Sequence, residues 1–508
     1  MPVHPVYRPI WRKISLVLAA AVVSALPATA ALTASTTSSG AVGPPATVRP
    51  LVADAVQVSR SEVPPTQAQC ASVRRRCFAP QAFRASYGLE TLPDGGQGKT
   101  IAVIDAFGNP NMAHDLHVFN KAFGFTALCG EEGVSGAACA GLGTFSTLNL
   151  GGSVFHVIPG NGTTGQQDSS GWAIETALDV EWAHVTAPKA SIVMVTTPTA
   201  ETLGVQGFPS IFKGIDYLSS NHLADVISMS LGSGEEAFGT PQNLVNFEKA
   251  LETARTNHVT VLASTGDAGP ENSFKTPVKN PRPIPGQSVI FPASSPLVTA
   301  VGGTYLCTGP QTGTTVDSTS PGGRCATFPG QREVAWRGSG GGFSHVFGRP
   351  SYQAALPSGS TFTGAGRGLP DVSLDAAPGT GVLEYVSAPG TGPFLTCPDG
   401  QPCSAGWYVI GGTSASSPGL AGIVAIADQQ AGRDLGFINP ALYRMAADSA
   451  TYAKDFFDVT TGTNQQLGSS TPGFDAGKGW DPVTGLGTSG FNAPRFITDL
   501  AAQVRPGD

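Results

Sequence analysis

Residues Thr100–Asp105 read TIAVID, a short apolar run that ends in an aspartate and precedes a Gly-Asn-Pro turn. A continuous apolar run bounded by turn residues is typical of a strand that is buried on both faces. The stretch Met112–Phe123 behind the turn has a helical pattern. We therefore predict a buried strand followed by a helix.

The same order recurs along the chain. Further apolar runs lie at Ser191–Val195, Asp225–Ser230 and Val259–Ser264, and helix-length segments such as Pro209–Ser220 and Gln242–Asn257 separate them. Strands that alternate with helices in this way are typical of a parallel sheet covered by helices on both faces. The sequence therefore predicts an α/β fold with a mostly parallel central sheet.

The composition limits the class of protein. The length of 508 residues alone predicts roughly three domains. Charged residues make up only 13%, but hydrophobic residues at 41% are enough for a core, which excludes wholesale disorder, collagen and coiled coil. The net charge of -7, without any long run of Lys or Arg, gives no electrostatic footprint for nucleic acid.

The N-terminus has the pattern of a secretory signal. Basic residues precede the apolar run Ile14–Leu26, and Ala28–Ala30 has the small-x-small pattern of a cleavage site. We predict a signal peptide at residues 1–30 and a secreted protein, although an uncleaved membrane anchor would carry a similar pattern. No later stretch approaches 18 apolar residues, so we expect no membrane association after signal removal.

Residues 31–79 are expected to be a leader or linker. Up to about residue 67 they are rich in Thr, Ser, Ala, Pro and Val and show no helical or strand period, so we expect them to form no core. The Gly-rich, Ser-rich region from about residue 305 to 410 is interpreted as loops and short strands on the same core. Its string Arg337–Phe343 lacks the Lys-Ser or Lys-Thr of a phosphate loop, which argues against nucleotide binding.

The cysteines favour an oxidising compartment. All eight follow the predicted signal, at positions 70, 77, 129, 139, 307, 325, 397 and 403. Pairing of sequence neighbours would close four local loops, although 105 connectivities are possible. Their spacings do not include the C-x2-C pair that zinc sites favour, so we expect disulfides of an exported protein.

One serine stands in surroundings suited to a nucleophile. Ser414 lies in Gly411–Pro418, GGTSASSP, directly before the apolar helical segment Gly419–Ala427. A serine at the opening of a helix, next to glycines, has an accessible hydroxyl and lies near the positive end of the helix dipole. An ordinary helix cap would also place Ser or Thr here.

Two carboxylates could serve as its base. Glu175 and Asp179 lie four residues apart in the helical stretch 171–184, GWAIETALDVEWAH, so both project from one face. If the pair is buried, desolvation and like-charge repulsion would raise one pKa and suit it to acid–base work at low pH. A solvated polar face is the alternative.

A third acid follows an apolar strand. Asp267 lies in Ser264–Gly269, STGDAG, where it could donate a hydrogen bond to an oxyanion only while it is protonated. Such a site would work in acid and fail as Asp267 ionises. The alternative is a turn aspartate between two glycines.

These three motifs, in this order, resemble the sedolisin (serine-carboxyl peptidase) family, from about residue 80 to the C-terminus. The string G-T-S-x-S-x-P also occurs in subtilisins. Further strings that look like sedolisin sequence are FPASSPLVTAVGGT at 291–304, RPSYQ at 349–353 and RGLPDV at 367–372. The resemblance implies a subtilisin-like fold with one peptidase domain at 80–508. It also implies that Ser414 is the nucleophile, Glu175 its general base, Asp179 the group that orients Glu175, and Asp267 the oxyanion donor.

The C-terminal part resembles the family's calcium-binding loop region. Asp and Gly residues there would supply carboxylates and backbone carbonyls, the oxygen ligands that Ca²⁺ takes. The resemblance implies one structural Ca²⁺ held by Asp458, Val459, Gly477, Gly479 and Asp481. A plain Gly-rich turn is the alternative.

Two features depart from the family pattern. Only about fifty residues separate the predicted signal from the peptidase domain, so we expect no full propeptide. Leu231 stands where many relatives have Trp beside the substrate-binding strand. Cleavage-site preference is therefore not carried over.

We expect a secreted, monomeric serine-carboxyl endopeptidase that cleaves proteins or peptides at acidic pH through an acyl-enzyme. One rival is a neutral subtilisin-type protease that uses Asp105 and a histidine, but His114, His117, His156 and His184 lack the H-G-T-H surroundings of that triad. Another rival is a secreted binding protein that keeps the fold without catalysis. No G-x-S-x-G string supports an α/β-hydrolase.

Overall fold

The computed structural model describes residues 53–152, 170–200, 204–205, 207–272, 283–319, 323–388, 405–505 and 507–508. The predicted signal and the first part of the leader lie outside these residues. The described residues all belong to one compact unit.

The core of this unit is an eight-stranded sheet in the order β10-β9-β7-β5-β2-β4-β3, in which β13 also pairs with β9. All pairs are parallel except β10 with β9. The strands are β2 (Thr100–Ala106), β3 (Phe145–Asn149), β4 (Ser191–Thr197), β5 (Val226–Met229), β7 (Thr260–Ser264), β9 (Thr299–Leu306), β10 (Glu333–Ala335) and β13 (Val372–Asp375). The mostly parallel sheet predicted from the sequence is confirmed.

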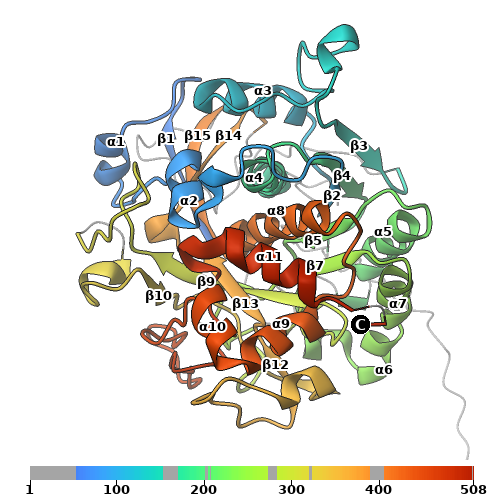
Figure 1. Ribbon diagram of the computed structural model, residues 1–508, viewed down its shortest axis with the longest axis vertical. Coiled ribbons are helices and arrows are strands. Elements are labelled where there is room, and N and C mark those ends of the chain that lie inside the picture. Colours follow the sequence, from blue (N-terminus) through green and yellow to red (C-terminus); the bar gives the residue numbers. More distant parts are fainter. Residues whose placement is uncertain are drawn as a thin grey trace, which may run out of the picture. The chain divides into compact units, whose positions relative to one another are not determined.

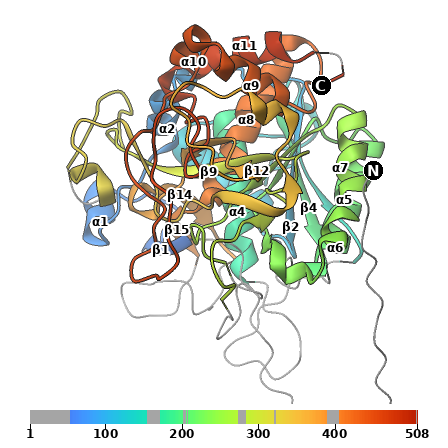
Figure 2. The same cartoon turned by 90° about the horizontal axis from the view of Figure 1, so that it is seen from below.

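Helices cover both faces because successive residues of each strand point to opposite sides. On β2, Ile101 and Val103 join one hydrophobic cluster, and Ala102 and Ile104 join the other. Figure 1 and Figure 2 show α4 and α8 on one side of the sheet and α5, α6 and α7 on the other. The helices are α1 (Gln67–Ser72), α2 (Pro80–Ser86), α3 (Met112–Phe123), α4 (Ser170–Thr186), α5 (Phe208–Ser220), α6 (Pro241–Val245), α7 (Glu248–Thr256), α8 (Thr413–Ala431), α9 (Asn439–Ala447), α10 (Ser449–Asp455) and α11 (Ala493–Gln503).

One predicted helix is divided. The segment Gln242–Asn257 forms α6 and α7, with a break at Asn246 and Phe247. Phe247 packs there into a cluster of rings that includes Phe212, 4.7 Å away between ring centroids. Tertiary packing thus overrides a helical pattern that continues in the sequence.

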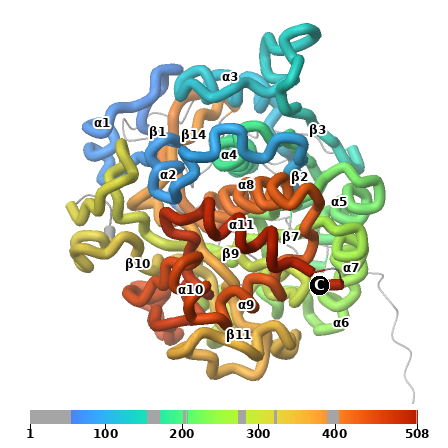
Figure 3. The backbone as a smooth tube through the Cα atoms, in the orientation of Figure 1, coloured from blue at the N-terminus to red at the C-terminus, as the bar shows by residue number. Residues whose placement is uncertain are grey.

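The central helices α4 and α8 pack closely because α8 is rich in small residues. A Cβ added at Gly422 would lie 1.9 Å from the Thr186 hydroxyl, so only glycine fits. The C-terminal helix also returns to the start of the folded unit, where the Ala493 amide donates to the Tyr87 carbonyl at 3.2 Å. Figure 3 shows these two segments, far apart in sequence, next to each other.

A smaller antiparallel sheet corrects one expectation. It has the order β1-β15-β14, with β1 (Ala53–Ser59), β14 (Val382–Val386) and β15 (Gly406–Gly411). The expected coreless leader therefore contributes a strand, in which Ala55 and Val56 are buried. The prediction was wrong here because β15, the partner of β1, lies some 350 residues away in the sequence. The local alternation of polar and apolar residues does not indicate such a distant pairing.

The remaining strands are short. β11 (Gly342–Gly348) pairs with β12 (Gly366–Leu369), and β6 (Ser233–Gly234) pairs with β8 (Ile290–Phe291). None of the helices in the described ranges combines the length and hydropathy needed to cross a bilayer.

Three disulfides follow the predicted neighbour pairing. They are Cys70–Cys77, Cys129–Cys139 and Cys307–Cys325. The fourth predicted pair, Cys397–Cys403, lies outside the described residues. Each bridge closes a short loop and joins no distant elements. Its stabilising effect comes mainly from the lower conformational entropy of the unfolded chain.

The burial of β1 generates a test. Val56→Asp replaces a core side chain with a carboxylate, and we expect it to lower the free energy of unfolding by about 3 kcal/mol or more. The same change at Val63, which is 70% exposed, should have little effect. Thermal unfolding of both variants checks this, and equal melting temperatures would contradict the role of β1 in the core.

Candidate active site

The helix α4 carries Glu175 and Asp179 into the interior. Both side chains are fully buried, and every residue from 171 to 186 is buried as well. The helix lies between the central sheet and β14, where the Trp182 indole donates to the Leu383 carbonyl at 3.0 Å. The solvated polar face considered as an alternative is therefore wrong.

Ser414 is the second residue of α8, which begins directly after β15. Gly412 precedes the helix with a φ of 122°, a backbone conformation that favours glycine. Pro418 cannot donate to the Ser414 carbonyl four residues earlier. The Ser230 hydroxyl lies 3.3 Å from that carbonyl, which is a second acceptor for its single proton beside Asp179 Oδ1 at 2.7 Å. A neighbouring loop thus contacts the backbone of Ser414.

Glu175 and Ser414 interact. Burial and the nearby carboxyls of Asp179 and Asp105 raise the pKa of Glu175 well above its usual value, and hydrogen bonding with Ser414 partly offsets this. Among the described residues no hydrogen bond of full geometry reaches either Glu175 oxygen, so the contact is longer or less aligned than an ideal one. Loose contacts of this kind are common in resting active sites and tighten in the substrate complex.

Asp179 and Asp105 complete a buried carboxyl cluster with Glu175. The Ser230 hydroxyl donates to Asp179 Oδ1 at 2.7 Å, but burial and Asp105 still raise the pKa of Asp179 well above normal. Burial likewise raises the pKa of Asp105 to about 7, against a lowering interaction with Thr176. Like charges in such a space cannot all ionise, so the cluster holds protons at acidic pH.

The placement of Asp105 bears on the neutral-protease alternative, which needs a histidine beside it. Among the described residues, the three histidines nearest to Asp105 in the sequence contact other groups. His114 contacts Glu132, His117 lies 3.7 Å from Glu131, and His184 contacts the Thr126 carbonyl at 3.1 Å. His156 lies outside the described residues.

Asp267 contacts the residue before the serine. Its Oδ1 accepts from the Thr413 amide at 2.7 Å and from the Thr413 hydroxyl at 3.0 Å. Its Oδ2 is buried and has no hydrogen-bond partner among the described residues. Burial raises the pKa of Asp267 to about 7, against these two hydrogen bonds. When the carboxyl is protonated, the proton therefore belongs on Oδ2, because Oδ1 already accepts two bonds.

The structure thus brings the four predicted residues together. Glu175 and Asp179 lie one turn apart on α4, and Ser230 contacts both Asp179 and the Ser414 carbonyl. Asp267 is bonded to Thr413, the residue before Ser414. Sequence reasoning missed Ser230, which bonds both Asp179 and Ser414. It lies at the carboxyl end of a central strand, and that position was the available signal. Asp105 was noticed only as part of a different triad.

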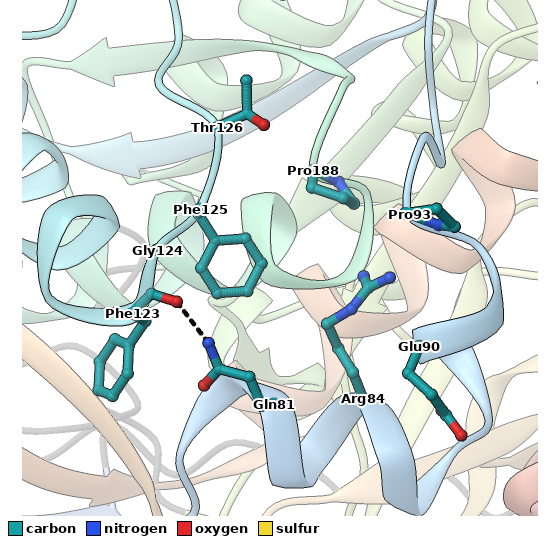
Figure 4. Close-up of a pocket in the computed structure, with 9 residues that line it drawn as sticks. All are labelled: Gln81, Arg84, Glu90, Pro93, Phe123, Gly124, Phe125, Thr126 and Pro188. Atoms are coloured by element: carbon teal, nitrogen blue, oxygen red, sulfur yellow. Dashed lines mark hydrogen bonds between the residues drawn. The ribbon is translucent and has the colours of Figure 1, made fainter.

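A separate pocket lies at the other end of α4 and contains none of these residues. Figure 4 shows Arg84 on one of its walls, with Phe125 and Pro188 nearby. The Arg84 guanidinium donates to the carbonyls of Val185 and Thr186, at 2.7 and 3.1 Å. A cation that binds the last carbonyls of a helix stabilises its C-terminus, so Arg84 helps to fix α4 in place.

The predicted calcium ligands also lie around one loop. Asp458 Oδ2 accepts from the Gly479 amide at 3.0 Å, and Asp481 Oδ2 accepts from the Gly477 amide at 3.2 Å. Asp458 Oδ1 is buried without a hydrogen-bond partner in the described part of the chain. Burial raises the pKa of Asp481 to about 7. An orphaned carboxylate oxygen beside a second buried carboxyl fits a cation.

No group of three or more His, Cys, Asp or Glu side chains within the described ranges is arranged to hold a metal. An ion bound by Asp458 and Asp481 would therefore need backbone oxygens, such as the carbonyls of Val459, Gly477 and Gly479, to complete its ligands.

Comparison with known proteins agrees with this geometry. Residues 136–455 match the sequence profile of the subtilase family. Kumamolisin of Bacillus sp. (strain MN-32) is 29% identical over 436 residues, which cover 84% of this chain and 64% of the relative. Tripeptidyl-peptidase 1 of Homo sapiens is 30% identical over 364 residues, which cover 68% of this chain and 55% of the relative. The chain thus spans between about half and two thirds of these relatives.

A solved structure, Pseudomonas sedolisin (serine-carboxyl proteinase) complexed with pseudo-iodotyrostatin, superposes with a TM-score of 0.59 at 25% identity. The superposition covers 84% of this chain and 98% of that one. The parallel sheet, the serine at the head of a buried helix and the adjacent carboxyl pair define a protein of subtilisin-like fold. The chain belongs to the subtilase family and, within that fold, to the sedolisins, the serine-carboxyl peptidases.

Proposed function

We propose that this protein is a secreted serine-carboxyl endopeptidase that hydrolyses peptide bonds at acidic pH through an acyl-enzyme. The observation that carries the proposal is the fully buried carboxyl pair of α4, Glu175 and Asp179. Ser230 joins this pair to the serine, because its hydroxyl lies 2.7 Å from Asp179 Oδ1 and 3.3 Å from the Ser414 carbonyl. The kumamolisin and sedolisin relatives support the reaction class.

In this mechanism, Ser414 Oγ attacks the scissile carbonyl carbon while Glu175 accepts the hydroxyl proton. Glu175 then returns that proton to the leaving amine, and water hydrolyses the acyl-enzyme with Glu175 again acting as base. Asp179, held by Ser230, orients Glu175 and shares its proton. Glu175 acts as the base in its ionised form, and the proton that the coupled pair retains in acid then belongs on Asp179. The raised pKa of Glu175 makes it a stronger base than a solvated glutamate.

Asp267 stabilises the oxyanion as a protonated acid. Its Oδ2 donates a hydrogen bond to the developing negative charge, while Oδ1 stays bound to Thr413. Since burial raises the pKa of Asp267 to about 7, this donor exists below that pH and is lost above it. The same shift therefore accounts for acidic activity.

Endopeptidase action is part of the proposal, and tripeptide release is its alternative because tripeptidyl-peptidases are among the relatives. Leu231, next to Ser230, is buried and lies two residues after the end of β5, near the proposed site. The three disulfides and the N-terminal signal pattern support secretion, and we propose that the enzyme acts as a monomer on protein or peptide substrates.

We further propose one structural Ca²⁺ at the loop that joins Asp458 and Asp481. The carboxylates of these residues and the carbonyls of Val459, Gly477 and Gly479 would hold it. Bound there, the ion would offset the charge of the buried Asp481 and the partly buried Asp458 and fix the loop.

The rate at which the enzyme cleaves a denatured protein substrate, measured from about pH 2 to 8, tests the assignment. We expect activity confined to acid, and a loss of at least about 10³-fold in Ser414→Ala and Glu175→Gln, because each removes a group that acts in the transition state. Ser417→Ala is the matched control, since its hydroxyl bonds Ser228 at 2.8 Å and not the carboxyl cluster.

Mass spectrometry of the products distinguishes internal cleavage from tripeptide release. Full activity in Glu175→Gln would overturn the role of Glu175. An optimum at neutral pH would favour the histidine-dependent rival, and failure of a serine-directed probe to label Ser414 at acidic pH would favour the noncatalytic one.

Asp267→Asn tests the oxyanion donor. The amide oxygen can keep the bonds from Thr413, and the amide nitrogen replaces Oδ2 with a donor that does not titrate. We expect the alkaline limb of the activity–pH profile to move upward, whereas Asp267→Leu should lose about 10²–10³-fold at every pH. An alkaline limb that stays at the wild-type pH in Asp267→Asn would contradict this role.

Chelation tests the metal site. Removal of Ca²⁺ should lower the melting temperature, because an ion at 100-fold excess over its Kd stabilises the folded state by about 2.7 kcal/mol. Asp458→Asn should weaken Ca²⁺ binding measured by calorimetry, and Asp475→Asn, an exposed change on the same segment, should not. Equal Ca²⁺ binding by both variants would refute the site.

A further inference from the structure

A second group of buried carboxyls lies next to the proposed catalytic pair. It consists of Glu181 on α4, Glu384 on β14 and Asp115 on α3, and all three side chains are fully buried. The proposed mechanism uses none of them. We refer to them as the α4–β14 carboxyls.

Hydrogen bonds join the three elements that carry the α4–β14 carboxyls, namely α3, α4 and β14. Besides the contact from Trp182 to Leu383, the Tyr385 amide donates to Glu181 Oε2 at 3.2 Å. The Ser387 amide donates to Asp115 Oδ1 at 3.0 Å, so β14 and the residue after it are bonded to both α4 and α3. These bonds force the three carboxyls into one apolar space.

Glu384 is the least compensated of the three. Neither of its carboxyl oxygens has a hydrogen-bond partner among the described residues. Glu384 lies opposite Tyr408 on β15, and Tyr408 lies opposite Gln57 on β1. The neighbour that β1 contributes is thus an amide, bonded to Tyr408 at 3.1 Å, and carries no charge that could balance Glu384.

The ionisable groups around Glu384 are almost all acids. From α4 come Glu181 and Asp179, and from α3 comes Asp115, which His114 partly offsets. No Lys or Arg is among the described groups that shift the pKa of Glu384. Burial and Asp115 raise it well above normal, and burial with Glu384 does the same for Glu181.

We propose that the α4–β14 carboxyls form a proton-dependent clamp on the catalytic helix. While they are protonated, α4 and β14 pack together and Glu175 and Asp179 keep their places. When the pH rises, Glu384 and Glu181 ionise side by side in the core, and their repulsion loosens α4 from β14. The clamp confines the ordered site to acidic conditions by packing, separately from the ionisation of Asp267.

The sign of the pH dependence follows from linkage. A carboxyl with a higher pKa in the folded state binds its proton more tightly there than in the unfolded chain. The stability it confers is therefore full below its unfolded pKa of about 4 and is lost as the pH rises toward its folded pKa. The clamp thus predicts a protein whose melting temperature falls from acidic to neutral pH.

The test is the melting temperature of Glu384→Gln between about pH 3 and 9. The amide has the shape of the protonated acid but cannot ionise, so we expect the pH at which half of the acid-state stability is lost to rise by roughly one unit. The control Glu62→Gln makes the same change at an exposed residue that faces Tyr385 from the segment after β1. It should leave the curve unchanged.

Glu181→Gln provides a second variant of the same kind, with the same expected shift. Curves of both variants that superimpose on the wild type would overturn the clamp. Loss of the fold by both variants at pH 4 would also overturn it, because the acids would then be needed as hydrogen-bonding groups at every pH.

An activity measurement adds a second arm, which rests on the proposed function. Glu384→Gln should keep acidic activity within about twofold and retain more activity after incubation at neutral pH than the wild type does. If the chain proves to have no peptidase activity, the melting curves still decide on the clamp. Failure of the proposed function and failure of the clamp are therefore distinguishable.

Discussion

The cost of placing charge in a low-dielectric interior is the constraint on which the rest of this structure depends. Two carboxyls on α4 interact with a third on β2, and all three side chains are fully buried. Ionisation of one of them raises the cost of ionising the next, so protons become structural components of the core. In the proposed mechanism, a serine whose base lies in such surroundings needs no histidine in acid, and α4 alone supplies both the proposed base and the group that orients it.

Close packing maintains this exclusion of water. Gly422 lets α8 approach α4 to a distance that no side chain would permit, and Pro418 leaves the Ser414 carbonyl for Ser230 to bind. Ser414, the proposed nucleophile, is thus held by three elements, which are β15 before it, α8 in which it lies and the loop after β5. Small residues in α8, which contribute little to the core by themselves, are therefore what allows the catalytic groups to meet.

Much of this arrangement was readable from the sequence, and the rest was not for identifiable reasons. TIAVID and the later apolar runs predicted the parallel sheet because strands buried on both faces need continuous hydrophobicity. The spacing of Glu175 and Asp179 placed both on one helix face, but only the structure shows that the face is buried. Ser230 and Glu384 were not predicted because their neighbours Ser414 and Glu181 lie 184 and 203 residues away in the sequence. The strand β1 escaped for the same reason, since its pattern becomes interpretable only once β15 is beside it.

The pairing of β1 with β15 has a mechanical consequence. Ala53 lies opposite Gly411, three residues before the nucleophile, in an antiparallel ladder at the edge of a three-stranded sheet. A molecule immobilised through its N-terminus would transmit any pulling force along β1 to the strand that positions Ser414. Attachment through the C-terminal helix α11 would leave that ladder unloaded and would instead load α8, against which α11 packs. The end by which this protein is tethered to a surface thus decides through which element, β15 or α8, tension reaches the proposed active site.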